Sequence, residues 1–237
     1  MSTAIVSEHI PDGFVIGADG RRIDPVSGLI GGDATQKIFG VNLGMGKLRL
    51  VYGWTGATWF EAKNGTTLLD LKDLTDEVLQ SLDMSSVSRF STFVRLFIDR
   101  LLLFFENSPG SPDIFQNKEI ATVLFVGYFD GEPCKAEIGI IRGQDTIFRP
   151  EITNLCVPAP FGYRIFTGSK AAFKVSNLSS GLPSSLQEAA TRVRDYIRLC
   201  FSHRDPPLNG ENPIGGHIHI GQLTPRGFRW IDPPKTI

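Results

Sequence analysis

Chemically reactive groups lie close together near the start of the chain. Ser2 and Thr3 place hydroxyls at the N-terminus, and charged side chains follow at Asp19 and Lys37. A hydroxyl is a poor nucleophile without a base, and a free α-amino group, with a pKa near ~8, can be that base. A nearby lysine stabilises the alkoxide, and an aspartate keeps the lysine charged and oriented. The groups therefore predict a nucleophilic N-terminus; the alternative is a surface ion pair of Asp19 with Lys37.

Short strands near the N-terminus must hold these groups. Apolar and β-branched runs are separated by turn residues, among them Pro11 and Gly13, which favour the φ values of a tight turn. A Gly-rich loop at 24–32 separates two strand pairs. The predicted strands are 3–7, 14–18, 37–43 and 48–52.

Two helices and further strands follow. Apolar residues recur at helical spacing over 85–105 and 184–203, and Ser184 with Gln187 predicts a capping box. The strands cluster in sets instead of alternating with helices, which favours packed antiparallel sheets flanked by helices over a doubly wound sheet. With no repeat or linker, one domain spanning 1–237 is expected. The later predicted strands are 120–128, 136–141, 163–167, 217–223 and 228–231.

The composition is that of an ordinary globular protein. Hydrophobic residues make up 41% and charged residues 21% of the 237. A net charge of −1 offers no basic excess for nucleic acid or an anionic membrane. The three cysteines are too few and scattered for a disulfide framework, so a reducing cytoplasm is expected. Neither a signal peptide nor an apolar run long enough to span a bilayer is recognised.

Two histidines raise the question of a metal. His217 and His219 alternate along a predicted strand and so face one side, as metal ligands do. No third ligand is evident nearby, and polar residues on a solvated strand are the preferred interpretation. Cys200 and His203 are similarly assigned to the core and the end of a helix. No metal and no cofactor are expected.

Two segments, 3–7 (Thr-Ala-Ile-Val-Ser) and 13–21 (Gly-Phe-Val-Ile-Gly-Ala-Asp-Gly-Arg), resemble the opening of proteasome β-type subunits and of the related bacterial ATP-dependent threonine peptidase. Those proteins begin at a catalytic threonine, followed by a strand, a turn and an Ala-Asp-Ser-Arg or Gly-Asp-Gly motif. Asp19 lies 16 positions after Thr3 (19 − 3 = 16), the family's separation. Lys37 resembles the family's active-site lysine, two positions further along than usual.

Later motifs resemble the same family in the same order. Thr55-Gly56-Ala57 sits where the family has a Gly-rich turn into its first helix; a backbone N–H of that turn forms the oxyanion hole, with Gly56 the best match and Thr55 the next. Gly168-Ser169 resembles the Gly-Ser beside the active site. The remaining matches are the hairpin at 124–131 and the terminal strand and turn at 214–227. The resemblance implies a four-layer αββα sandwich of the N-terminal-nucleophile (Ntn) hydrolase class.

The N-terminus departs from the family pattern. The family exposes its threonine by removing a propeptide or a single methionine, whereas Met1 and Ser2 precede Thr3 here. Loss of Met1 leaves Ser2 at the N-terminus. Ser2 is then the nucleophile, or a second trimming exposes Thr3, or the site is inactive.

The terminal motif departs as well. Where the family has an aspartate and a serine, this chain has Glu211 and Ile214. Glu211 could replace the acid with a longer reach, but Ile214 cannot replace a hydroxyl. Family members without the full set occur as non-catalytic ring subunits, so the fold alone does not carry activity.

Two functional hypotheses follow. One is an Ntn hydrolase of the threonine-endopeptidase or amidohydrolase type, whose nucleophile uses its own amine as the base. In it Lys37 tunes the charge, Asp19 and Arg21 hold Lys37 and the loop, Gly56 stabilises the oxyanion, and Ser169 is a polar contact near the amine. The other is a catalytically inactive proteasome-like subunit with a scaffold or binding role. The residues assigned to the site are Ser2, Thr3, Asp19, Arg21, Lys37, Gly56, Ser169 and Glu211.

Partners are expected from the same resemblance. A peptide or protein is the expected substrate, and a homo-oligomer, such as a ring, is the expected assembly. An ATPase is a candidate partner, because the chain has no nucleotide-binding loop of its own. No partner among nucleic acids or membranes is expected.

Overall fold

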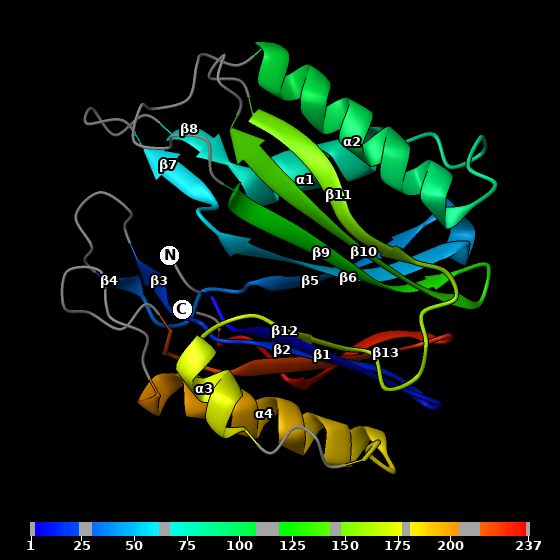
Figure 1. Ribbon diagram of the computed structural model, residues 1–237. Coiled ribbons are helices and arrows are strands. Elements are labelled where there is room, and N and C mark those ends of the chain that lie inside the picture. The colour runs from blue at the N-terminus through cyan, green and yellow to red at the C-terminus, as the bar shows by residue number, and fades with distance from the viewer. Residues whose placement is uncertain are drawn as a thin grey trace.

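Two five-stranded antiparallel sheets form the centre of the structure, which is a computed structural model (Figure 1). The predicted antiparallel sheets are therefore confirmed. One sheet runs in the order β12 (Arg164–Phe166), β1 (Ile5–Ile10), β2 (Gly13–Ala18), β13 (His219–Thr224), β14 (Gly227–Asp232). The other runs β11 (Phe148–Cys156), β10 (Glu132–Arg142), β9 (Glu119–Phe129), β6 (Leu48–Gly56), β5 (Ile38–Leu43). The residues described are 3–23, 30–61, 67–107, 119–142, 148–176, 181–203 and 214–235.

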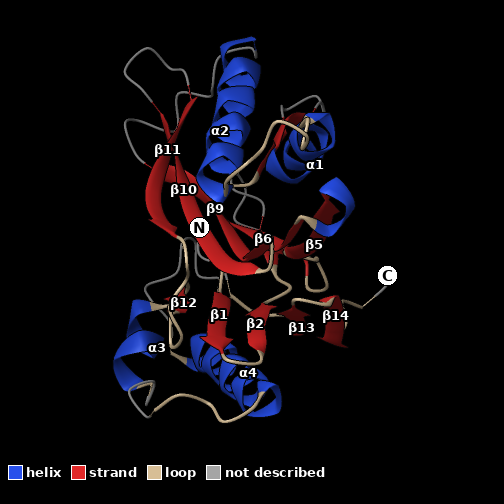
Figure 2. Cartoon of the chain, turned by 90° about the vertical axis from the view of Figure 1, so that its right-hand side faces the viewer, coloured by secondary structure: helices blue, strands red, loops and turns tan. Residues whose placement is uncertain are grey.

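Helices lie on the outer faces of the two sheets, as two perpendicular views show (Figures 1 and 2). The sheet that contains β9 is covered by α1 (Leu71–Ser81) and α2 (Phe90–Asn107). The sheet that contains β1 is covered by α3 (Lys170–Val175) and α4 (Leu186–Ser202). Two small antiparallel ribbons lie at the end of the molecule that holds the N-terminus (Figure 1): β3 (Arg22–Ile23) with β4 (Ile30–Gly32), and β7 (Trp59–Glu61) with β8 (Thr67–Asp70).

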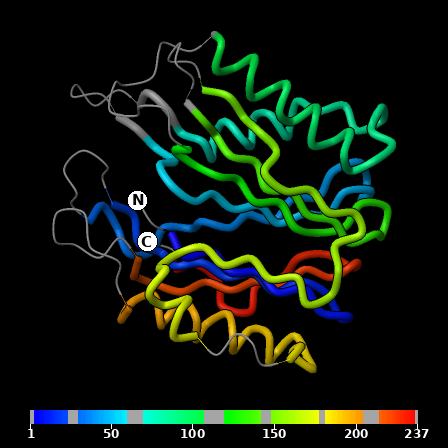
Figure 3. Tube along the Cα trace, in the orientation of Figure 1, coloured from blue at the N-terminus to red at the C-terminus, as the bar shows by residue number. Residues whose placement is uncertain are grey.

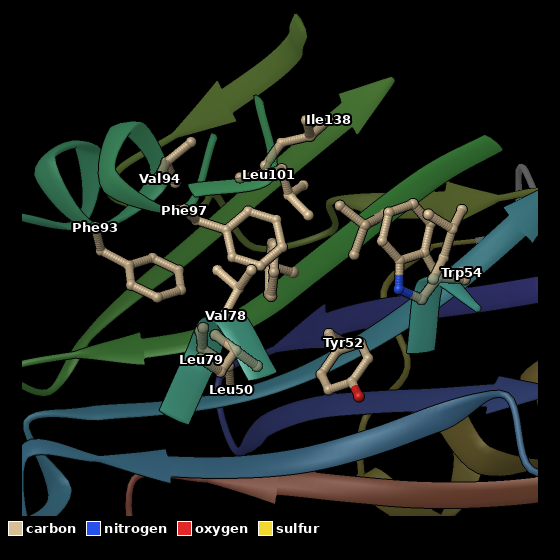
Figure 4. Close-up of a cluster of buried hydrophobic side chains, with 14 of the residues drawn as sticks. Leu50, Tyr52, Trp54, Val78, Leu79, Phe93, Val94, Phe97, Leu101 and Ile138 are labelled. Atoms are coloured by element: carbon tan, nitrogen blue, oxygen red, sulfur yellow. The ribbon is translucent and has the colours of Figure 1, made fainter. Parts of the chain in front are cut away.

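Buried apolar side chains fill the spaces between sheet and helix and between sheet and sheet. Beneath α2, side chains such as Phe97, Leu101 and Val78 gather in one cluster (Figure 4). The ring of Phe97 meets that of Phe125 edge to face, with centroids 4.9 Å apart. A second cluster lies between α4 and its sheet, and a third joins the two sheets through residues such as Ile16 and Val126. Apolar burial of this extent is the main force that holds such layers together.

The strands β1 and β2 are buried along their whole length. Successive side chains of a strand point to opposite faces, so Ile5 and Ile16 enter the core between the sheets, whereas Val6 and Val15 pack beneath α4. The apolar runs that predicted these strands are explained by their being covered on both sides, although β1 also buries Ser7, Glu8 and His9.

The first helix does not follow the Gly56 turn directly, which corrects the family-based expectation for that turn. The ribbon β7–β8 intervenes, and α1 begins only at Leu71. The Leu71 N–H donates to the carbonyl of Thr58 at 2.9 Å, so the chain returns to where it left. The path of the chain through the two sheets can be followed in Figure 3. Asp70 then starts α1, because its carboxylate accepts from the N–H groups of residues 72 and 73.

Other boundaries differ for local reasons. The second helix, α2, begins at Phe90 instead of 85, since Asp83 accepts from the Ser85 N–H (2.9 Å) and holds the chain in a turn. The capping box of α4 is shifted by one residue: Ser185 caps the Glu188 N–H, and Glu188 reaches back to the N–H of Ser184. The predictions did not include β11, α1 or α3.

The predictions about the cysteines and about membrane-spanning segments can be compared with the structure. Cys134, Cys156 and Cys200 are free thiols, with Cys200 in the core and His203 at the end of α4. Among the helices that the structure describes, none is long and apolar enough to cross a membrane.

Replacing Phe97 by alanine should lower the free energy of unfolding by about 3–5 kcal/mol, because its fully buried ring leaves a cavity against Phe125. Phe173→Ala is the matched control; that ring is 55% exposed, and the expected cost is under about 1 kcal/mol. Denaturant unfolding at fixed pH measures both values. Equal costs for the two variants would contradict the packing described.

Candidate active site

The carboxylate of Asp19 is fully buried and gathers donors from four parts of the chain. One oxygen accepts from the N–H of Ala4 (2.9 Å), and the other from the N–H groups of Arg21 and Gly215 (3.2 Å each). The ammonium of Lys37 lies 3.0 Å from both oxygens. A buried carboxylate needs this degree of compensation, so Asp19 anchors the site from within the protein and is not a surface partner.

Lys37 connects this anchor to Thr3. Its Nζ lies 3.5 Å from the hydroxyl oxygen of Thr3, long for a hydrogen bond but close enough for a strong electrostatic interaction. Burial lowers the pKa of Lys37 from its ordinary value, and the charge and hydrogen bonds of Asp19 oppose that shift. The structure thus brings Thr3, Asp19 and Lys37 close together.

Thr167 holds the backbone on either side of Thr3. Its hydroxyl accepts from the Ile5 N–H at 2.7 Å and donates to the carbonyl of Thr3 at 2.9 Å. The Thr167 N–H in turn donates to the carbonyl of Ile5 at 2.9 Å. The sequence analysis missed this residue, since a lone threonine that is 164 positions from its partner carries no local signal.

The Gly168-Ser169 pair lies beside this segment, although its hydroxyl bonds elsewhere. A Cβ on Gly168, whose φ is +125°, would lie 3.3 Å from the Cβ of Ala4, so glycine allows the close approach. The Ser169 hydroxyl accepts from the Ala172 N–H as the cap of α3 and donates to the carbonyl of His203 at 2.5 Å. Its single proton is therefore donated to the C-terminal end of α4.

Arg21 braces the loop that carries Lys37, through a partner that the sequence did not reveal. Its guanidinium binds both carboxylate oxygens of Asp33, at 2.6 and 3.1 Å. The carbonyl of Asp33 accepts from the His217 N–H at 2.6 Å, and the Thr35 N–H donates to the carbonyl of Gly20 at 2.9 Å. The guanidinium thus contacts Asp33 and not Lys37, while the Arg21 N–H contacts Asp19.

His219 positions the backbone of Lys37 from the neighbouring sheet. Its Nε2 accepts from the Lys37 N–H at 3.1 Å, and its ring packs edge-on against Trp230. Burial, then the positive charges of Lys37 and His217, lower the pKa of His219 to about 3, so the ring is neutral near pH 7. The residue is 1% exposed, which corrects the interpretation of this strand as solvated.

Gly56 ends β6 at the same site. Its φ is +87°, and a Cβ there would lie 2.3 Å from the carbonyl oxygen of Ile120, so only glycine fits. The N–H of the next residue, Ala57, is already bonded to that carbonyl at 2.7 Å. Of the two oxyanion candidates, Gly56 lines the cavity beside Thr3, and Thr55 is not among the described lining residues.

Two of the predicted site residues and one departure from the family pattern remain to be located. Ser2 and Glu211 lie outside the described residues. Ile214 is 2% exposed and packs in the apolar cluster beneath α4, where the family has a hydroxyl. The described residues contain no group of three or more histidine, cysteine or acidic side chains that could hold a metal ion.

A cavity of about 340 Å³ opens next to Thr3. Thr3, Lys37 and Gly56 line it, together with three aromatic side chains and several polar and charged ones. The arrangement places a hydroxyl, an ammonium and a backbone turn around a space large enough for one side chain of a ligand. A hydroxyl with a free amine on the same residue could attack a carbonyl held there. The aromatic lining residues are Phe39, Trp54 and Trp59.

Comparisons with known proteins bear on the fold. No model of a protein family matches the sequence, and no curated protein sequence matches it. Among solved structures, the chain is similar to the Anbu (Gly-1) mutant from Hyphomicrobium sp. strain MC1, with a TM-score of 0.58 and 16% sequence identity. The match covers 97% of this chain and 87% of that chain. Anbu is a bacterial proteasome-related subunit, so this chain shares the fold of such a subunit.

Replacing His219 by glutamine should reduce the amount by which the free energy of unfolding falls at acid pH. The pKa of folded His219 is about 3, against an ordinary 6.5, so between those values the unfolded chain binds a proton that the folded chain does not. Wild-type stability should therefore fall as the pH drops below 6.5. Glutamine can still accept the Lys37 N–H but takes up no proton.

Denaturant unfolding at pH 7.5 and pH 4.5 tests this. The loss of stability between those pH values should be smaller in His219→Gln by about 2–3 kcal/mol. His203→Gln, at the end of α4, is the control and should follow the wild type. If all three proteins lose the same free energy of unfolding, the assignment of His219 as a neutral, buried side chain is wrong.

Proposed function

We propose that this protein is an Ntn hydrolase that cleaves peptide amide bonds, with Thr3 as the nucleophile once it is the N-terminal residue. One observation carries the proposal: the Lys37 ammonium, held 3.0 Å from the buried Asp19 carboxylate, points at the Thr3 hydroxyl on the wall of a cavity. The similarity to a proteasome-related fold supports it.

The finer fold assignment belongs to the same proposal. We interpret the two sheets and their covering helices as the four-layer αββα sandwich of Ntn hydrolases, forming one domain over 1–237. We further propose that the chain assembles with copies of itself, as the likeness to a proteasome-related subunit suggests. An ATPase partner and a cytoplasmic location stay predictions from the sequence.

The chemistry follows from the geometry around Thr3. The α-amino group of Thr3 takes the hydroxyl proton as Oγ1 attacks the substrate carbonyl, and the nearby Lys37 favours the negative oxygen. We assign the stabilisation of the oxyanion to the N–H of Gly56, which lines the cavity; such a donor contributes roughly 3 kcal/mol in comparable sites. The amine then returns the proton to the leaving nitrogen, and the C–N bond breaks. Water hydrolyses the resulting ester and regenerates the hydroxyl.

Two observations favour the alternative, a catalytically inactive subunit. The side chain of Ile214 is buried among apolar residues where the family has a hydroxyl, and the proton of Ser169 is committed to His203. Fewer groups are then available to orient a terminal amine. The charged pair of Lys37 and Asp19 favours the enzyme, because desolvating both groups has a cost that a scaffold has no need to bear.

The intact mass of the purified protein should show loss of both Met1 and Ser2, which exposes Thr3. A variant that lacks Ser2 should be at least as active on a fluorogenic peptide amide as the wild type, because removal of Met1 alone then exposes Thr3. Thr3→Ala should reduce the rate at least about 10³-fold, whereas Thr3→Ser should keep part of it.

The same variants separate the alternatives. If Ser2 is the nucleophile, only Met1 is lost, and Ser2→Ala is inactive while Thr3→Ala is not. If Met1 is retained and no variant changes a background rate, the protein is a non-catalytic subunit.

Replacing Lys37 by alanine should lower kcat/KM about 10²- to 10³-fold, since the charge that stabilises the alkoxide is lost. Lys174→Ala, on the exposed surface of α3, is the control and should retain full activity. Because the single change leaves the Asp19 carboxylate buried without its counter-ion, it is expected to destabilise the fold by about 3–5 kcal/mol.

A double variant keeps this test interpretable. Asp19→Asn with Lys37→Met removes both charges together and should be more stable than Lys37→Ala in denaturant unfolding. We expect it to remain inactive. A folded double variant with wild-type activity would show that Lys37 has no catalytic role.

A further inference from the structure

The ribbon β7–β8 is a closed excursion at the edge of the cavity. It leaves the chain after Thr58 and returns at Leu71, whose N–H donates to the Thr58 carbonyl at 2.9 Å. Trp59 pairs with Asp70 across the ribbon, and both residues line the cavity. The excursion therefore adds a wall at the position where the family resemblance implied a helix.

The other small ribbon meets this wall. The guanidinium of Arg22, on β3, lies 4.1 Å from the centre of the Trp59 indole, within the range of a cation–π contact. Arg22 also lines the cavity. The contact joins two ribbons that are otherwise separate sheets, so together they limit the space beside Thr3.

The larger part of the cavity surface is apolar. The indole N–H of Trp54 is bonded to the Thr75 hydroxyl at 2.9 Å, so the polar atom of that ring is satisfied within the protein. Phe39 and Ile23 complete the apolar surface.

Charged lining groups near β7–β8 are engaged with α1. Asp70 caps the helix, and the Lys72 ammonium lies 2.9 and 3.1 Å from the carboxylates of Asp73 and Asp76. A charged group of a ligand would compete with these bonds. The lining cations Lys37 and Arg21 are likewise bonded, to Asp19 and Asp33, so a ligand carboxylate would have to compete with those carboxylates as well.

We propose that this cavity takes a large apolar side chain, above all an aromatic one, from the residue whose carbonyl Thr3 attacks, and that Trp59, held by Arg22, determines the preference. The inference rests on the proposed function and deepens it, because it names the class of peptide bond that is cleaved. A volume of about 340 Å³ suits a single large side chain.

Kinetics on a matched substrate set test the preference. Fluorogenic peptide amides that differ only in having phenylalanine, alanine, aspartate or arginine before the scissile bond should give kcat/KM values at least about 10-fold higher for phenylalanine than for each of the others. Trp59→Ala should lower the phenylalanine-to-alanine ratio of kcat/KM at least about 10-fold.

Three companion variants make the result specific to this wall. Trp59→Phe should restore most of the ratio, and Arg22→Gln should lower it by a smaller factor than Trp59→Ala. Phe173→Ala removes an exposed ring far along the chain and should leave the ratio unchanged. If Trp59→Ala cleaves with an unchanged ratio, or if the wild type does not favour phenylalanine, the assignment of the cavity is wrong while the hydrolase stands.

A binding experiment separates the cavity from catalysis. In Thr3→Ala protein, N-acetyl-phenylalaninamide should shift the tryptophan fluorescence at concentrations where N-acetyl-alaninamide does not, and adding Trp59→Ala should remove the response. Selective binding with no cleavage by the wild type would support the cavity and overturn the proposed function. Absence of both binding and cleavage would overturn both proposals.

Discussion

The compensated charge of Asp19 is the constraint on which the rest of the site depends. Removing a carboxylate from water is costly, and the fold offsets that cost only by bringing an ammonium and three backbone N–H groups to it. Those donors come from the segments around residues 4, 21, 37 and 215, which span nearly the whole chain. The segments can meet only when the strands are in register, so the charged centre and the sheet arrangement specify one another.

The site lies between the two sheets and draws on both. The sheet with β1 and β2 supplies Thr3, Asp19 and His219 at or next to its strand ends, whereas the sheet with β5 and β6 supplies Lys37 and Gly56. The contact between the Lys37 N–H and a neutral His219 links the two sheets directly. Relative movement of the sheets would therefore change the position of the ammonium with respect to the Thr3 hydroxyl, which gives packing far from the site an influence on its chemistry.

Much of this arrangement was predictable from local patterns, and the remainder was not. The strand pairs and the long helices follow from periodicity and turn residues, and the grouping of Asp19 with Lys37 follows from the family resemblance. Thr167 and Asp33 were missed because their roles depend on partners distant in sequence, which no local pattern encodes. The ribbon β7–β8 was missed because a short apolar and aromatic run is compatible with either strand or helix. The predicted cap of α4 was wrong by one residue because adjacent serines offer equivalent hydroxyls. Only the position of Glu188, which bonds back to Ser184, distinguishes them.

The complete burial of β1 has a consequence for how the N-terminal segment exchanges its amide protons and unfolds. Chain termini usually fray on fast timescales, whereas β1 begins at Ile5 and is hydrogen-bonded on one side to β2 and on the other to β12. Its amides should exchange with solvent only when the whole domain opens, as in the most protected units of other proteins. Heat denaturation of this segment would then follow the rate of global unfolding, with no earlier phase in which β1 separates from an otherwise intact protein.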